Sequence, residues 1–154
     1  MATNTSLDTS YSWTNASPLW LRVAYGLFGL WFALLGVHML IDPAGWYSST
    51  PGVPEEGPMN IHFIRDIGSA FIMVAAAYGF SLQKNTNWHL PAVAAVLPAL
   101  HGGIHLVGII SGHSHGAAVM VEVFAVIFPG GVAVLMPLVH YRHQSKGAGR
   151  EITV

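Results

Sequence analysis

The chain has 154 residues, enough for one domain, and 53% of them are hydrophobic while only 8% are charged. A soluble domain carries about a quarter charged residues, so this composition indicates a membrane protein. A net charge of −1 gives no reason to expect a nucleic-acid partner. The absence of cysteine excludes disulfides and thiolate metal sites.

Four apolar segments are each long enough to cross a bilayer, which takes about 20 helical residues. The predicted spans are residues 19–41, 61–82, 88–110 and 117–141. Inside lipid, a chain of this kind satisfies its backbone polar groups only as helices. Short links join the later spans, so consecutive spans run antiparallel. We predict an all-α fold, an integral membrane four-helix bundle with up-down topology.

The spans form one transmembrane domain over residues 18–142, between a polar N-terminal tail (1–17) and a polar C-terminal tail (143–154). Five of the six basic residues fall on one side of the predicted bundle: Arg22, Lys84, Arg142, Lys146 and Arg150. The opposite loops contain no Lys or Arg. By the positive-inside rule both termini are cytoplasmic, and a bacterial inner membrane is the expected location.

Seven ionisable residues are predicted near the outer ends of the four spans: His38, His62, Arg65, Asp66, His101, His105 and Glu122. At 1.5 Å per residue, they lie roughly 2–14 Å below the outer boundary. The inner half has no counterpart, because His89 and His140 are predicted at the inner interface. In a protein with so few charges, this shared depth indicates a functional buried site.

The spacing of these residues suggests metal binding. His62 and Asp66 are four residues apart, as are His101 and His105, so each pair shares one helical face. Together with Glu122 and His38 they offer nitrogen and carboxylate oxygen ligands, which suit a divalent transition metal such as iron, copper or zinc. Haem, held by two facing histidines, is the less favoured cofactor.

Simpler explanations exist for single residues. His38 can be an interfacial histidine, and Arg65 and Asp66 can form a structural ion pair. Glu122 is harder to explain in this way, because a carboxylate among apolar residues costs several kcal/mol unless it is paired or protonated.

The four short spans, the Arg65-Asp66-x-Gly68 segment at the start of the second and a histidine late in the third resemble the small bacterial DoxX-like membrane proteins. The resemblance covers about residues 19–141. It implies the four-helix fold, and it implies redox chemistry because some members are associated with quinone-linked sulfur oxidation. The His101/His105 pair and Glu122 do not match features of that group.

The leading functional hypothesis is a metal-binding membrane protein, acting as a metal-dependent oxidoreductase on a lipophilic or outward-side substrate. The metal ligands would be His38, His62, His101, His105, Asp66 and Glu122. Asp66 and Glu122 would alternatively transfer protons, and Arg65 would offset negative charge. Two alternatives need no catalysis: an accessory subunit of a larger membrane complex or homo-oligomer, and a protein for metal-ion or proton transit.

The orientation is testable because the chain has no cysteine of its own. We expect a single cysteine at Ser49, in the 42–60 loop, to react with a membrane-impermeant thiol reagent only from outside the cell. A cysteine at Ser145 in the C-terminal tail should react only after the membrane is opened. The reverse pattern at the two positions would show that the orientation is inverted.

Overall fold

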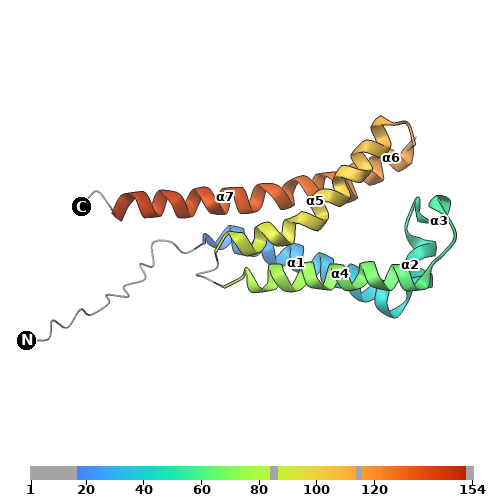
Figure 1. Cartoon of the computed structure of the whole chain (residues 1–154), viewed down its shortest axis with the longest axis horizontal. Helices are drawn as coiled ribbons and strands as arrows, with labels where there is room; N and C mark the ends of the chain where they lie inside the picture. The colour runs from blue at the N-terminus through green and yellow to red at the C-terminus, as the bar shows by residue number, and fades with distance from the viewer. Residues whose placement is uncertain (1–16, 84–86, 114–115, 152–154) are drawn as a thin grey trace, which may run out of the picture.

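The structure is a computed structural model (Figure 1) that describes residues 17–83, 87–113 and 116–151, with the side chains at 117 and 147–151 excepted. The predicted N-terminal tail, apart from Ser17, lies outside the described residues. The same is true of 84–86 and 114–115 in the two short links and of the last three residues. The described residues form helices and the links between them, and no strand occurs among them.

Four long apolar segments dominate the described chain, as the sequence predicts. They are α1 (Leu19–Ile41), α4 (Ile61–Phe80), α5 (His89–Ile110) and a fourth segment that ends in α7 (Phe128–Glu151). All four are long and apolar enough to cross a membrane. The fourth helix continues beyond the predicted boundary at residue 141, so part of the predicted C-terminal tail is helical.

The fourth span is not one uniform helix. It begins as α6 (Ala117–Glu122), widens into the π-helix η2 (Val123–Ile127) and continues as α7. Pro129 explains the change, because proline has no N–H to donate and its ring clashes with the carbonyl one α-helical turn earlier. The N–H of Phe128 bonds to the carbonyl of Val123, five residues back. Single π-turns of this kind are frequent at functional sites.

The long loop between the first two spans contains two short helices, α2 (Pro43–Ser49) and α3 (Val53–Glu56). The hydroxyl of Tyr47 donates to the carbonyl of Gly57 at 2.7 Å and so ties the loop together. Asn60 caps α4, since its side chain accepts from the N–H of Phe63 at 3.1 Å.

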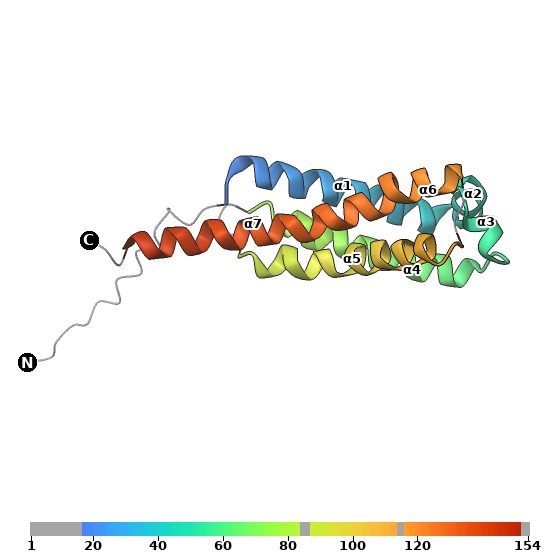
Figure 2. The same cartoon turned by 90° about the horizontal axis from the view of Figure 1, so that it is seen from above.

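The long helices form two antiparallel pairs, α1 with α4 and α5 with α7 (Figures 1 and 2). Both ends of the described chain lie at one end of the molecule, here called the N/C end. The opposite end, called the loop end, contains α2, α3 and α6. At the loop end, the α5–α6 hairpin diverges from the α1–α4 pair (Figure 1).

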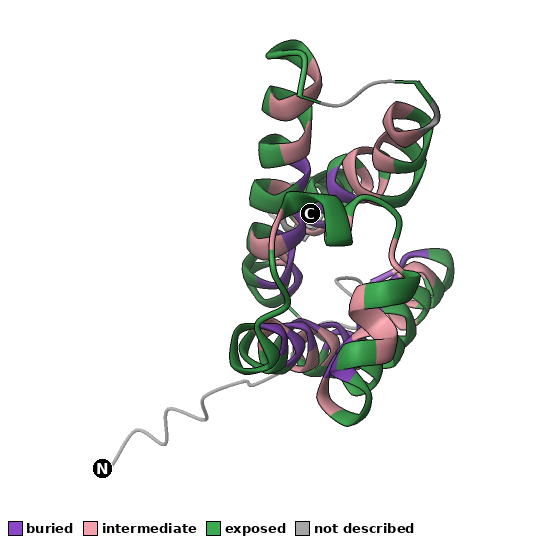
Figure 3. Ribbon diagram, turned by 90° about the vertical axis from the view of Figure 1, so that its right-hand side faces the viewer, coloured by how far each residue is buried: buried purple, intermediate pink, exposed green. Residues whose placement is uncertain are grey.

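The buried residues line the inner faces of the helices, and exposed residues cover the outer faces (Figure 3). On α1 the buried positions recur at helical spacing: Leu21, Tyr25, Gly29, Phe32, Gly36 and Met39. Large apolar side chains face outward instead, and Leu27 and Ile41 are 63% and 77% exposed. Such a surface suits hydrocarbon rather than water.

Each helix pair is joined where glycine lets two backbones touch. A Cβ atom at Gly36 of α1 would lie only 2.7 Å from the carbonyl oxygen of Gly68 on α4. A Cβ at Gly130 of α7 would lie 2.7 Å from the carbonyl oxygen of Pro98 on α5. Because lipid gives helices no hydrophobic reason to associate, such close packing holds membrane helices together.

We expect Gly36→Ala to reduce the free energy of unfolding by about 1–3 kcal/mol, the usual cost of overpacking. The added methyl group would meet backbone, which cannot rotate away. Gly79→Ala on α4 is the matched control, because no heavy atom lies within 4 Å of its Cβ position. Both variants can be measured by denaturant unfolding in mixed micelles. Equal stability of the two would argue against the close backbone contact.

Candidate functional site

The clearest polar contact inside the described spans joins His105 to Glu122. The Nδ1 atom of His105 lies 3.2 Å from the Oε2 atom of Glu122. Their side chains are 31% and 18% exposed, so both are largely withdrawn from the surroundings. The sequence analysis places Glu122 in one site with His38, His62, His101 and His105, and the structure confirms its proximity to one of these, His105.

The local fold of the loop end brings the two residues together. His105 lies in the last turns of α5, and Glu122 is the last residue of α6. Between the two helices, Gly112 and Gly116 adopt positive φ angles of 74° and 62°, which side chains rarely tolerate. The π-helix begins directly after Glu122.

His101 extends this pair along α5. Its ring meets the ring of His105 edge to face, with 4.7 Å between centroids. Gly102 packs closely against the fourth span, since a Cβ atom added to it would lie 3.5 Å from the backbone of Ile127, whereas Gly103 faces open space. The two imidazoles therefore lie edge to face along one side of α5, and that of His105 is the one beside the carboxylate of Glu122.

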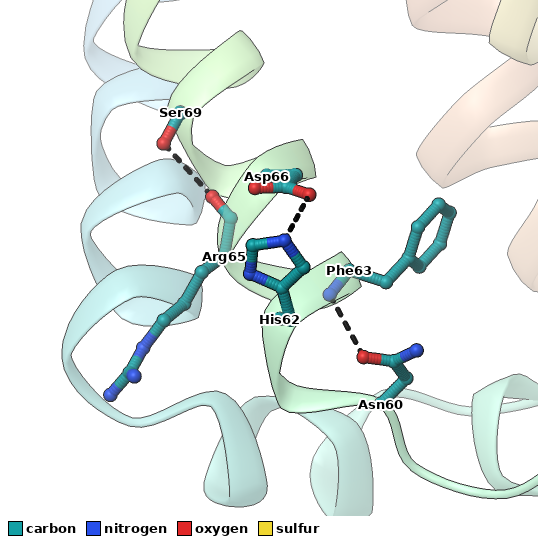
Figure 4. Close-up of polar contacts among 6 residues, drawn as sticks. All are labelled: Asn60, His62, Phe63, Arg65, Asp66 and Ser69. Carbon is teal, nitrogen blue, oxygen red and sulfur yellow. Dashed lines mark hydrogen bonds and ion pairs between the residues drawn. The ribbon is translucent and has the colours of Figure 1, made fainter.

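His62 and Asp66 form a separate contact on α4 (Figure 4). The Nε2 atom of His62 lies 3.5 Å from Oδ2 of Asp66, and the side chains are 90% and 60% exposed. An exposed pair of this kind contributes little stability. Arg65 points away from Asp66 and donates from Nε to the carbonyl oxygen of Leu40 at 3.3 Å. Among the described residues, the alternative Arg65–Asp66 ion pair does not form.

His38 is exposed on α1. Within the described part of the chain, no hydrogen bond, ion pair or ring contact joins it to the other six residues of the predicted cluster.

The seven residues therefore do not meet in one site. The structure brings together His101, His105 and Glu122, and separately His62 with Asp66. No group of three or more His, Asp or Glu side chains in the described ranges is arranged to hold a metal ion. The reason is geometric: the sequence determines depth along a helix but not the separation between helix pairs, and at the loop end the two pairs diverge (Figure 1).

A second buried polar cluster lies near the N/C end, where sequence reasoning expected only interfacial residues. Tyr25, Tyr78 and His140 are each 0% exposed. The hydroxyl of Tyr25 lies 3.3 Å from Nδ1 of His140. Tyr25 and Tyr78 stack at 5.9 Å between ring centroids. The sequence does contain a signal for the burial of Tyr25. Tyr25 lies at helical spacing from Leu21 and Gly29, which places its phenol on the packed face of α1.

No family model, no curated protein and no solved structure matches this chain. The resemblance to DoxX-like proteins therefore stays a prediction. The site must be interpreted from its own chemistry.

The contact between His105 and Glu122 can be measured by a double-mutant cycle with His105→Leu and Glu122→Leu. We expect a coupling energy of about 1–3 kcal/mol, because each single variant leaves one polar group without this partner in an apolar layer. The readout is unfolding in mixed micelles. The same cycle on His62 and Asp66 is the control and should give a coupling near zero. Additive effects at His105 and Glu122 would contradict a direct contact.

Proposed function

We propose that this chain is an integral membrane protein that binds a divalent first-row transition metal ion at His105 and Glu122. The loop end faces outward in this proposal, as the distribution of basic residues predicts. The observation that carries the proposal is the 3.2 Å distance between Nδ1 of His105 and Oε2 of Glu122.

That distance fits two ligands of one ion. Zinc binds imidazole nitrogen and carboxylate oxygen at about 2.0–2.2 Å, and a tetrahedral angle then separates the two donor atoms by about 3.4 Å. A nitrogen and oxygen ligand set also suits copper and iron. His101 is the nearest candidate for a third ligand, and its ring would have to turn toward the ion because it now meets His105 edge to face.

The proposed site is smaller than the one predicted from the sequence. His38, His62, Asp66 and Arg65 take no part in it, because they lie apart from the His105–Glu122 contact. With two or three protein ligands, the ion keeps open positions for water or a substrate, as catalytic metal sites do. Oxidoreductase chemistry on a lipophilic or outward-side substrate would use such a position, and so would metal transit.

The competing explanation is that the two residues share a proton and join α5 to α6 without any metal. In that case the contact satisfies a costly carboxylate in the apolar layer and does nothing more. The alternative function, an accessory subunit of a larger membrane complex, would then be favoured over metal binding.

The test is Zn²⁺ binding to purified protein, measured as metal per chain and as affinity. We expect His105→Ala and Glu122→Gln each to weaken binding more than the 10–100-fold that is typical of losing a supporting partner. His62→Ala is the matched control and should bind as the wild type does. An absorption spectrum of the same sample detects haem.

The outcomes separate the hypotheses. If His62→Ala loses the metal as His105→Ala does, the larger predicted site is favoured over the smaller one. If the wild type binds no Zn²⁺, or if every variant binds it equally, metal binding at this site is wrong and the shared-proton explanation remains.

A further inference from the structure

The buried cluster at the N/C end contains hydrogen-bonding atoms without partners among the described residues. These are the hydroxyl oxygen of Tyr78 and the Nε2 atom of His140, and each has less than 1 Å² of exposed surface. Buried polar atoms are nearly always paired, so an orphaned one in a native protein indicates a missing water or ligand. Two of them in one cluster, beside the Tyr25 ring, call for an explanation.

The chemistry of the cluster indicates what is missing. Tyr25 has one hydroxyl hydrogen, and donating it to Nδ1 of His140 places the imidazole hydrogen on Nε2. In the opposite arrangement, Nδ1 of His140 donates to the Tyr25 oxygen. Both the hydroxyl hydrogen of Tyr25 and the Nε2 lone pair of His140 would then lack a partner. The cluster then offers two free donors, the hydroxyl of Tyr78 and the N–H of His140. The matching partner is a hydrogen-bond acceptor, such as a carbonyl oxygen.

An apolar groove of about 300 Å³ lies one aromatic ring away from this cluster. It lies between α1 and the η2–α7 segment and is lined by Leu27, Phe28, Trp31, Phe124, Phe128 and Val132 among others. Phe28 connects the two features, because it lines the groove and its ring contacts the ring of Tyr78 at 5.8 Å between centroids.

The direction of the groove matches a lipid of the leaflet at the N/C end. Tyr25 lies six residues into α1, about 9 Å from its start. His140 precedes Tyr141, whose ring contacts Trp88 at 5.1 Å, in the belt of aromatic side chains that marks the membrane interface. From this level the groove continues along α1 toward Trp31, which is toward the middle of the membrane.

We infer that the groove and the cluster together bind one glycerolipid, with an acyl chain in the groove and an ester carbonyl oxygen accepting from Tyr78 and His140. An apolar cavity with a few convergent polar groups is the usual form of a site for a lipophilic ligand. This inference does not depend on metal binding at the loop end.

The experiment is native mass spectrometry of the full-length protein, offered an equal mixture of diester phosphatidylethanolamine and its diether analogue with the same chains. The diether lacks the carbonyl oxygens. We expect the wild type to retain one lipid and to prefer the diester about 2–10-fold, the range that one or two net hydrogen bonds give. Tyr78→Phe should keep the fold, because it removes an unpaired hydroxyl, and should reduce this preference.

A second variant tests the groove. Ala125→Trp would fill it and should abolish lipid retention. Ala76→Trp, in the shallow groove between α1 and α4, is the matched control and should retain the lipid. Equal retention of diester and diether by the wild type would overturn the inference. So would an unchanged preference in Tyr78→Phe, or normal retention by Ala125→Trp.

Discussion

Direct contact between helix backbones is the constraint on which the rest of this structure depends. Gly36 meets the Gly68 carbonyl, and Gly130 meets the Pro98 carbonyl, each at distances that leave no room for a side chain. In hydrocarbon, apolar side chains gain nothing by leaving the solvent, so close packing and polar contacts must hold helices together. Glycine provides this packing within each pair. The protein is therefore better described as two helix pairs than as a symmetric bundle of four.

This organisation decides which polar residues can meet. His105 and Glu122 belong to the same half of the molecule, joined by the short link between α5 and α6, and they approach to 3.2 Å. His62 and Asp66 belong to the other half and pair with each other instead. A site spanning both halves would need them to approach at the loop end, where they diverge (Figure 1). The smaller site at His105 and Glu122 follows from this separation.

Polar groups within the spans gather at two levels of the molecule. Near the loop end, the carboxylate of Glu122 lies 3.2 Å from the imidazole of His105, which contacts the ring of His101. Near the N/C end, Tyr25 and His140 pair across α1 and α7, and Tyr78 stacks on Tyr25. Apolar and aromatic side chains, among them Phe32 and Phe71, occupy the levels between. The two clusters are therefore chemically distinct: one contains a carboxylate, and the other contains two phenol hydroxyls and an imidazole.

The sequence by itself determined the four long apolar segments and the place of each polar residue along them, because hydrophobic length and helical rise are local properties. It did not predict the short helices α2 and α3, the π-helix or the extension of α7 to Glu151. It also indicated that Glu122 needs a partner, since an isolated carboxylate in lipid is too costly. Only the tertiary structure decided which partner it has. Residues at one depth can lie on opposite sides of a bundle, and their separation depends on how helices pair. For the same reason the sequence predicts His140 at the inner interface but does not show that packing against Tyr25 buries it completely.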